Sequence, residues 1–456
     1  MRERATLGAL GADGEYHTRR RTDLTSASGE KVGELSLVSP LYVRRTMAAL
    51  RQASVPRTSD RFAMLEKAAD LYLNGIVAGL GADAYARLVS VASGVPLAFV
   101  RSSATGVAQA LRALRHTAGL AMPRGAVAEW DDLRTAEGAA VWTRKGEVFA
   151  VHASGNTPAV HSLWLEALAL GYKVAVRPST REPFTAFRLV SALRAAGFGN
   201  DTVALLPCDH ATADVIIAEA DFAMVYGGQD VIDKYAGDPR VLPQGPGRSK
   251  VLVTKDVDWH EKIGLIADAV SFLGGTACVC TTSVLVEGDP APVAEALAER
   301  LSRIPTLPAE DPSAILAVQP RDQADRIDQY LRNVAGGTRA WLGGDRIVDE
   351  LPQGGAVLRP AVHEVHSSDA PQLNVELPFP CVWVGPWAPE DGTAPLKDSL
   401  VVTAMTQDRQ LVENLLQEPS IANVYLGDHP TTWMRPGVPH DGYLGEFLMR
   451  TKSMIR

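Results

Sequence analysis

Apolar strands alternate with helical segments between residues 147 and 226, and this order constrains the fold more than any other feature. The apolar pattern predicts strands over 147–151, 173–177, 202–206 and 221–226, and helices over 158–170, 182–196 and 211–220. Alternation of this kind indicates a parallel sheet with right-handed crossovers, and such sheets bind ligands beyond the carboxyl ends of their strands. The sequence therefore predicts an α/β fold with a site at one sheet edge.

A second α/β series follows the first. Strands are expected over 250–254 and 282–286, helices over 261–271 and 292–301, and further signals continue to about residue 425. Helices are also expected over 40–53, 59–80 and 99–120, whereas residues 1–40 are polar and rich in turns. The segment 442–456 is too short to fold alone and is expected to dock elsewhere on the protein. A length of 456 residues suits two or three units of roughly 100–200 residues each.

The composition argues against several classes of protein. With 46% hydrophobic residues, the chain can form a packed core throughout. Its 45 basic and 53 acidic residues leave a formal charge of −8, so no basic field attracts nucleic acid. The N-terminal region has no apolar run of about 7–15 residues, and no run of about 18 occurs anywhere. We therefore expect a cytoplasmic protein without a signal peptide or membrane span.

The turn after the first predicted strand of the sheet contains Ser154, Gly155 and Asn156 ahead of a helix N-terminus. Gly155 permits a tight turn, and Asn156 can present its side-chain amide at the carboxyl edge of the sheet. An ordinary N-cap by Asn156 or Thr157 also explains the pattern, and the turn taken alone favours it.

Two further turns could bind a phosphate group. The turn after the second strand contains two guanidinium groups and two hydroxyls in the series Arg177, Pro178, Ser179, Thr180 and Arg181. A solvated surface loop explains this series equally well. The turn after the fourth strand has paired glycines, Gly227 and Gly228, ahead of a helix, but it lacks a full G-x-G-x-x-G pattern.

Four cysteines, Cys208, Cys278, Cys280 and Cys381, show no disulfide framework. Cys278 and Cys280 follow a Gly274-Gly-Thr-Ala turn between a helix and a strand, where amide N–H groups can stabilise a nucleophilic thiolate. Two small buried residues explain the pattern equally well. We expect no metal site, because no further cysteines or histidines cluster nearby.

Together these turns resemble the aldehyde dehydrogenase superfamily from about residue 148 to the C-terminus. Residues 155–158 resemble its W-N-F-P segment, 177–179 its K-P segment, 227–228 its G-S turn, 275–278 its G-Q-x-C segment, 376–380 its E-I-F-G-P segment and 444–446 its closing segment. The resemblance implies that Cys278 is the nucleophile and that Asn156 donates to the oxyanion. It assigns cofactor binding to Ser154, Gly155, Arg177, Pro178, Ser179, Thr180, Arg181, Gly227, Gly228, Glu376 and Phe379.

The resemblance also implies an aldehyde dehydrogenase-like α/β fold with a Rossmann-type cofactor domain. Residues 1–246 would form an N-terminal helical layer and the nucleotide-binding domain, and 247–425 the catalytic domain. Residues 426–456 would dock back and, with 121–146, form a small oligomerisation element of a homodimer or homotetramer.

One position departs from the family pattern. Hydrolytic members have a glutamate about 34 residues before the cysteine, where it activates water, and this chain has Gln244 there. An amide cannot accept a proton from water near neutral pH, so hydrolysis of an acyl-enzyme loses its base. Acylating members do not need that base. We accordingly expect Gln244→Glu to raise hydrolytic activity.

Residues 30–45 and 374–382 resemble the LuxC-type acyl-CoA reductases within the superfamily. This resemblance implies reduction of an acyl-CoA or similar thioester to an aldehyde, with coenzyme A as the leaving group. Thr180 stands where NAD-preferring members commonly have a glutamate, and Arg177 and Arg181 flank it, so NADPH is favoured over NADH.

Two alternatives remain open at this point. The first is an acyl-phosphate or acyl-adenylate reductase, supplied by an acyl-activating, ATP-dependent partner enzyme. The second is a non-catalytic scaffold of the same fold, which the cysteine, asparagine and glutamate at matching positions disfavour. The identity of the acyl group cannot be predicted. Trp164, Trp259 and Phe272 could line a tunnel, although large apolar residues of helices are more often core.

Overall fold

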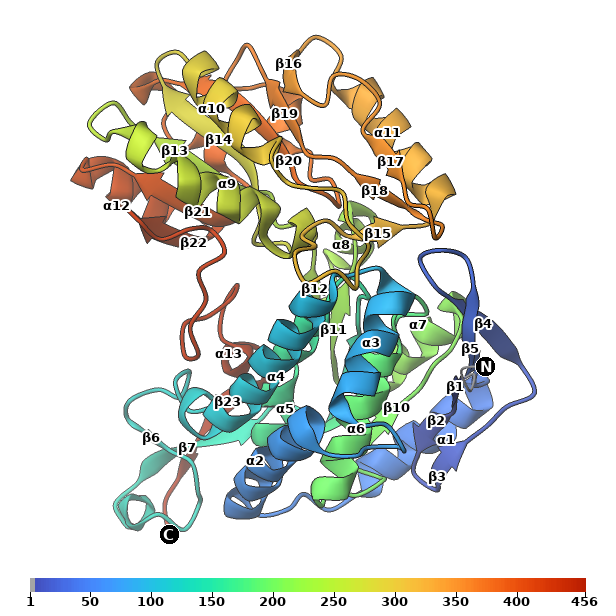
Figure 1. Cartoon of the computed structure of the whole chain (residues 1–456). Helices are drawn as coiled ribbons and strands as arrows, with labels where there is room; N and C mark the ends of the chain where they lie inside the picture. Colours follow the sequence, from blue (N-terminus) through green and yellow to red (C-terminus); the bar gives the residue numbers. More distant parts are fainter. Residues whose placement is uncertain (1–4) are drawn as a thin grey trace.

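A computed structural model describes residues 5–456, and a parallel sheet forms its first layer (Figure 1). The sheet has seven strands in the order β12-β11-β8-β9-β10-β2-β3. Their bounds are β12 (Val241–Gln244), β11 (Phe222–Tyr226), β8 (Val148–His152), β9 (Lys173–Arg177), β10 (Val203–Leu205), β2 (Ala9–Gly11) and β3 (Gly14–Tyr16). The five strands from β12 to β10 are parallel, as the alternation predicts, while β2 and β3 extend the sheet antiparallel.

Helices cover both faces of this sheet. Val148 and Ala150 pack on one face with α1 (Pro40–Gln52) and α7 (His210–Glu219). Phe149 and Val151 point to the other face. That face is covered by α2 (Thr58–Asn74), α3 (Ala82–Ser93), α4 (Leu97–Thr117), α5 (Leu165–Ala169) and α6 (Phe184–Ala196). Because strand residues alternate between the two faces, the continuous apolar strands place a core on each side.

A second seven-stranded sheet forms the other lobe. Its order is β16 (Arg339–Leu342), β19 (Ala361–Glu364), β20 (Cys381–Trp387), β14 (Thr281–Glu287), β13 (Ser249–Val253), β21 (Ser399–Met405) and β22 (Ile421–Leu426). Only β16 runs antiparallel. Apolar clusters join one face to α9 (Ile263–Ser271) and α10 (Ala291–Leu301), and the other to α11 (Arg321–Val334) and α12 (Arg409–Gln417).

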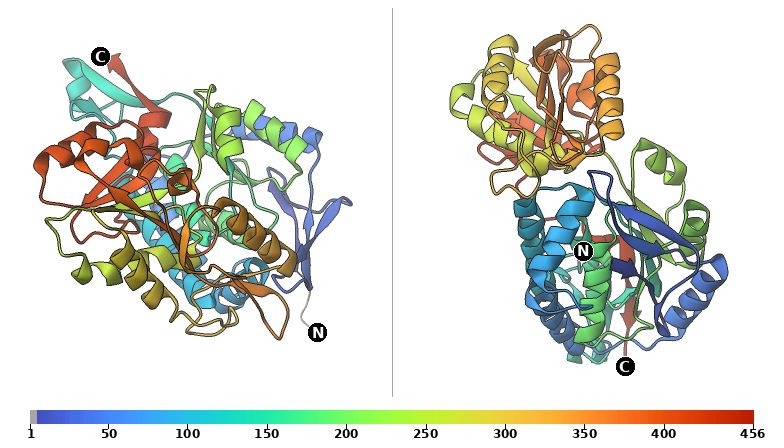
Figure 2. Two further views of the ribbon diagram at one scale, coloured as in Figure 1. Left: turned by 90° about the horizontal axis from the view of Figure 1, so that it is seen from above. Right: turned by 45° about the vertical axis from the view of Figure 1, so that its right-hand side comes forward.

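The chain returns to the first lobe after β22. It crosses between the lobes, forms α13 (Leu444–Leu448) beside α5, and ends in β23 (Met449–Met454) (Figures 1 and 2). The last strand, β23, pairs antiparallel with β7 (Ala139–Arg144), which pairs with β6 (Ala126–Val127). The hydroxyl of Tyr172 donates to the carbonyl of Leu448 at 2.5 Å. The C-terminal segment therefore connects both sheets to one small three-stranded sheet.

The structure differs from the sequence prediction at three places. The described part of residues 1–40 is not mainly turns: β1 (Ala5–Leu7), β4 (Arg21–Thr25) and β5 (Lys31–Ser36) form a sheet, in which the exposed pairs Arg21–Glu34 and Lys31–Asp23 cross between strands. The helix expected over 59–80 ends at Asn74. The helix expected over 158–170 is a 3₁₀ turn, η2 (Pro158–Ser162), followed by the short α5.

Two smaller features complete the description. A three-stranded sheet of β15 (Val318–Gln319), β18 (Ala356–Leu358) and β17 (Val348–Glu350) flanks the second lobe. Within residues 5–456, no single helix has the length and apolar composition needed to cross a membrane. The bent pair α3 and α4, joined at 120°, meets that criterion by length and composition only.

Candidate active site

Cys278 lies on a turn that the backbone forces into an unusual conformation. Leu273, Gly274 and Gly275 all have positive φ values, of 47°, 70° and 70°, just before the cysteine. A side chain at Gly275 would lie 2.3 Å from the backbone nitrogen of Pro380, so only glycine fits this approach. The turn thereby brings Cys278 to the edge of the second sheet, next to the 376–380 segment.

The four thiols lie in different environments. Cys208, Cys280 and Cys381 are buried, whereas Cys278 is partly exposed. Burial raises the pKa of Cys208 to about 11 and raises those of Cys280 and Cys381 further. The Cys280 thiol also donates to the carbonyl of Phe272 at 3.1 Å. Of the four, Cys278 has the thiol that a substrate can reach.

The side chain of Asn156 is held in one orientation by two hydrogen bonds. The Ser154 hydroxyl donates to Asn156 Oδ1 at 2.7 Å, and Asn156 Nδ2 donates to the carbonyl of Thr276 at 3.0 Å. Thr157, not Asn156, caps the following 3₁₀ turn, since its hydroxyl accepts from the amide of Ala159. Asn156 is therefore free of the capping role, and the second N–H of its amide is available beside the cysteine turn.

The first two turns of the predicted cofactor site are in contact. A side chain at Gly155 would lie 2.5 Å from the Ser179 hydroxyl oxygen, so the two backbones pack closely. Ser179 in turn accepts from the amide of Arg181 at 3.2 Å. The exposed Arg181 also donates to the carbonyl of Ser93 at 2.9 Å. Pro178 is buried beneath this turn, and Thr180 is exposed.

Two buried polar atoms at the same sheet edge fit a polar ligand. Arg177 and His152 are opposite each other at the ends of β9 and β8. Neither Arg177 Nε nor His152 Nε2 has a hydrogen-bond partner among the residues that the structure describes. Burial and the Arg177 charge lower the pKa of His152 to about 3, so its ring is neutral. Buried polar groups are nearly always hydrogen-bonded, so these two atoms are open to water or to a bound polar group.

The paired glycines connect the first sheet to Gln244. The amide of Gly227 donates to the backbone carbonyl of Gln244 at 3.0 Å, and Gly228 precedes α8 (Gln229–Tyr235). A side chain at Gly227 would lie 2.2 Å from Val231, so this position requires glycine. The glycine turn thus lies directly beside the segment that contains Gln244.

The 376–380 segment approaches the cysteine through a second close contact. Glu376 accepts from the amide of Arg248 at 2.7 Å. Desolvation raises the pKa of Glu376, and the amides of Arg248 and Gly247 oppose this shift. A side chain at Gly247 would lie 1.7 Å from the carbonyl oxygen of Cys278. Glu376 therefore lies near Cys278 with its carboxylate already hydrogen-bonded, while Phe379 is buried in the core behind the cysteine turn.

The structure adds two residues that the sequence did not single out, His440 and Asp441. His440 Nε2 lies 3.5 Å from Cys278 Sγ, and His440 Nδ1 lies 3.6 Å from an Asp441 oxygen, an ion-pair rather than a hydrogen-bond distance. Gln244 Nε2 donates to the other Asp441 oxygen at 2.7 Å. Burial lowers the pKa of His440, but the neighbouring Asp441 and Cys278 outweigh it and raise the value to about 10.

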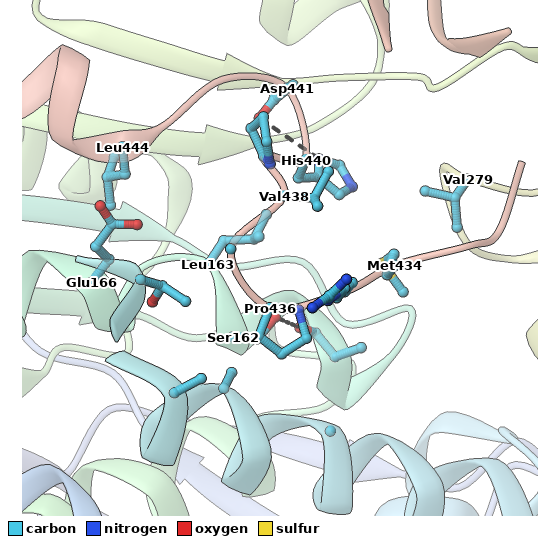
Figure 3. A pocket seen from close by; sticks show the side chains of 18 of the residues that line it. Ser162, Leu163, Glu166, Val279, Met434, Pro436, Val438, His440, Asp441 and Leu444 are labelled. Carbon is cyan, nitrogen blue, oxygen red and sulfur yellow. Dashed lines mark hydrogen bonds and ion pairs between the residues drawn. The ribbon is translucent and has the colours of Figure 1, made fainter. Parts of the chain in front are cut away.

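A cavity of about 640 Å³ opens beside this group of residues. Figure 3 shows its roof, formed by the 434–444 segment with His440 and Asp441, and Glu166 beside Leu444. Phe272 lines the cavity, whereas Trp164 is fully buried in the core. Burial raises the pKa of Glu166 to about 7, and its carboxylate accepts from the amide of Gly445. Most of the wall is apolar, as ligand pockets usually are.

Comparisons with curated proteins find partial matches. A 2-hydroxymuconic semialdehyde dehydrogenase from Pseudomonas putida is 25% identical over 279 residues, which cover 56% of this chain and 55% of the relative. Human aldehyde dehydrogenase 1A1 is 28% identical over 143 residues, which cover 29% of this chain and 28% of that protein. These matches therefore span about half of the first relative's length and less than a third of the second's.

Comparisons with solved structures cover nearly the whole chain. An NAD-dependent aldehyde dehydrogenase from Sinorhizobium meliloti has a TM-score of 0.83 at 17% identity, covering 99% of this chain and 95% of that one. An NADP-dependent enzyme from E. coli has a TM-score of 0.80 at 17% identity, covering 98% of both chains. At these identities the similarity shows the fold. The family model described as "Aldehyde dehydrogenase family" matches residues 23–443. Because this match covers most of its length, the chain belongs to the aldehyde dehydrogenase family.

Proposed function

We propose that this protein reduces an acyl thioester, such as an acyl-CoA, to an aldehyde through a thioester on Cys278. The observation that carries the proposal is the environment of Gln244. This side chain is buried, and its amide donates to Asp441, so it cannot accept a proton from water. Without that base, an acyl-enzyme persists long enough to be reduced.

The acyl-transfer step uses groups that the turn already holds in place. Cys278 attacks the thioester carbonyl, and the oxyanion accepts from the Asn156 side chain and the Cys278 backbone N–H. Asn156 is preoriented by Ser154 and Thr276, so little reorganisation accompanies charge development. One such donor typically lowers the barrier by about 3–4 kcal/mol.

The cofactor in this proposal is NADPH, which supplies a hydride to the acyl-enzyme. Arg177 offers a buried, unpaired Nε at the end of β9, and the exposed Thr180 and Arg181 follow it. Ser154, Gly155, Pro178, Ser179, Gly227, Gly228, Glu376 and Phe379 complete the proposed binding surface. A neutral hydroxyl flanked by two guanidinium groups favours a 2′-phosphate over a free ribose hydroxyl.

The cavity supports an apolar acyl group. Its volume of about 640 Å³ lies within the usual range for small-molecule sites, roughly 300–1,000 Å³. Apolar wall residues from α4, the cysteine turn and the roof include Val107, Ala110, Leu114, Phe272, Leu273 and Val438. Because the cavity opens beside Cys278, an aliphatic or aromatic acyl chain can extend into it from the thioester.

The sheet formed by β6, β7 and β23 is the proposed oligomerisation element. It lies at the edge of the molecule, where the views in Figure 2 place the C-terminus beside the 126–144 segment. We propose that it joins two copies of the chain and that residues 1–246 and 247–425 act as the cofactor and catalytic domains. The cytoplasmic location expected from the sequence remains a prediction.

The test is a panel of aliphatic and aromatic acyl-CoAs with NADPH or NADH and no partner enzyme. We expect loss of the cofactor absorbance with matching aldehyde formation, a lower KM for NADPH, and no reaction with Cys278→Ala. Absence of reduction with every acyl-CoA, but activity after adding ATP, free acid and an acyl-activating enzyme, would favour the acyl-phosphate or acyl-adenylate alternative. Aldehyde oxidation to a free acid as the main activity would contradict the proposal.

A further inference from the structure

We propose that His440 is the acid–base partner of Cys278, with Asp441 and Gln244 as the residues that position it. This deepens the proposed acyl transfer and rests on it. The observation is a chain of contacts from Sγ of Cys278 to His440 Nε2, from His440 Nδ1 to Asp441, and from Asp441 to Gln244, at 3.5, 3.6 and 2.7 Å. A nucleophile, a base and a group that orients the base form the arrangement used for covalent catalysis.

The backbone of His440 is fixed to the second sheet. Asn423, on β22, donates both to the carbonyl of His440 and to the carbonyl of Leu400, the latter at 2.9 Å. These bonds fix the backbone position from which the His440 ring extends toward Cys278. Its Nδ1 atom is buried and has no hydrogen bond within the described part of the chain, which leaves the Asp441 carboxylate as its ionic partner.

The charged and titratable groups around the imidazole are few. Asp441 faces it from its own segment and Cys278 from the turn before β14. Tyr226, on β11, is half-buried close to both Cys278 and Asp441, and its hydroxyl donates to the carbonyl of Val160 at 3.0 Å. Desolvation and these two neighbouring groups raise the pKa of Tyr226, so it stays neutral and contributes no charge.

Gln244 thus holds Asp441 in place in this proposal. Its amide N–H holds one Asp441 oxygen, and its backbone is held by the amide of Gly227. The residue that stands at the position of the hydrolytic base therefore orients the carboxylate that faces His440. A glutamate at this position would put two carboxylates at hydrogen-bond distance and would compete for the same proton.

The proton transfers balance over one acyl transfer. His440 begins the cycle with a proton on Nε2, and the Cys278 thiolate that it pairs with forms the Sγ–carbon bond. The carbon–sulfur bond to the leaving thiol then breaks, and His440 gives its proton to that thiolate. Reduction and release of the aldehyde consume one hydride and leave a Cys278 thiolate, and His440 takes one proton from solvent. Since His440 and Asp441 line the cavity, the leaving thiol and the ring can meet.

The first test needs neither acyl-CoA nor NADPH. The rate of alkylation of the full-length protein by iodoacetamide is measured from pH 5.5 to 9.5, with Cys278→Ala giving the background from the three buried thiols. For wild type we expect a rate that changes less than about threefold between pH 6.5 and 9. For His440→Gln we expect the profile of an ordinary thiol, with an inflection near pH 8.5 and a rate at pH 6.5 on the order of 100-fold lower.

Two further variants keep this test falsifiable. Asp441→Asn should give an intermediate profile, and His429→Gln, which changes an exposed histidine of the same segment, should match wild type. Coincident profiles for wild type and a folded His440→Gln protein, judged by circular dichroism and thermal unfolding, would overturn the proposal. If His440→Gln changes the pH profile of alkylation as expected but wild type reduces no acyl-CoA, only the proposed function would be overturned.

The second test separates proton delivery from a merely structural role. An S-phenyl thioester (the thiophenol ester) releases thiophenolate, a weak base that can leave without a proton. An acyl-CoA releases a basic alkyl thiolate, which leaves more readily when it is protonated. We expect His440→Gln to lower kcat with acyl-CoA by about 10²–10⁴-fold. The fold loss of kcat with the thiophenol ester should be at least about ten times smaller. Equal losses with both esters would contradict a proton-donating role for His440.

Discussion

At the scale of single residues, we expect opposite results from substituting Cys278 and Cys280, although the two cysteines are two positions apart. Cys278→Ala should abolish the covalent acyl adduct, because Cys278 is the partly exposed thiol beside His440. Cys280→Ala should keep the adduct, because its thiol is buried and donates to Phe272. Intact-protein mass spectrometry after incubation with acyl-CoA alone measures both. An adduct that maps to Cys280 would contradict the assignment.

Gln244 needs a paired substitution. From the sequence alone, Gln244→Glu is expected to raise hydrolysis, but the structure places Asp441 at 2.7 Å from the amide. In the single variant the two carboxylates would share one proton, and we expect a loss of reductase activity with little gain in hydrolysis. Gln244→Glu with Asp441→Asn restores an amide–carboxylate bond in reverse, so we expect this double variant to hydrolyse acyl-CoA faster than either single variant. Free thiol released without NADPH consumption measures hydrolysis.

The sequence could predict the residues that lie on turns after strands, and it could not predict those that arrive from elsewhere. Asn156, Cys278 and Gln244 were singled out because their motifs resemble segments of the aldehyde dehydrogenase superfamily in order and spacing, and their roles remain predictions. His440 and Asp441 follow a segment with no periodicity, and His440 meets Cys278 across 162 positions of chain. A His-Asp pair between Pro439 and Gly442 was the available signal, and local pattern carries no information on such a distant contact.

At the scale of elements, the two large sheets could be predicted from the sequence, whereas the strands β4 and β5 and the break between η2 and α5 could not. Continuous apolar strands such as β8, β9 and β13 are typical of parallel sheets. The strands β4 and β5 contain alternating charges that pair across the sheet, and those charges resemble a solvated loop in the sequence. The break between η2 and α5 lies beside the cavity. Tertiary packing there outweighs the local preference of residues 158–170 for a continuous helix.

The contact between α5 and α13 makes stability depend on pH. Burial raises the pKa of Glu166 to about 7 from an ordinary value of 4.5, so the folded state holds an extra proton between these values. This contribution to stability is complete below pH 4.5 and is lost as the pH rises through 7. It amounts to about 3 kcal/mol at most.

Glu166→Gln keeps an acceptor for Gly445 and removes the titration. We therefore expect the free energy of unfolding of the variant to fall less between pH 5 and 7 than that of wild type. Urea unfolding at pH 5, 6 and 7 measures the difference, and Glu413→Gln, which changes an exposed glutamate of α12, is the matched control. Parallel curves for Glu166→Gln and wild type would show that Glu166 does not titrate in this range.

At the scale of the whole molecule, one segment links stability, assembly and chemistry. Residues 427–456 leave the second sheet, carry His440 to Cys278, roof the cavity and end as β23 against β7. The segment is anchored at its far end by Tyr172, whose hydroxyl donates to Leu448, and by Lys145, whose ammonium donates to the carbonyls of Glu446 and Phe447. Anchors in the first lobe therefore help to hold His440 beside Cys278 at the edge of the second.

Loosening that anchor should lower the reactivity of Cys278 from a distance. Tyr172→Phe removes the bond to Leu448, whose carbonyl keeps the Lys145 amide as a donor, and leaves the Gly146 amide without its acceptor, which should cost about 1–3 kcal/mol of stability. We also expect slower alkylation of Cys278 at pH 6.5, because His440 is held less firmly, with Tyr330→Phe on the exposed side of α11 as control. Deletion of residues 449–456 should have the stronger effect and should shift the elution volume toward a monomer, since β7 loses its partner. Unchanged alkylation in both variants would show that the roof holds His440 without help from the C-terminal strand.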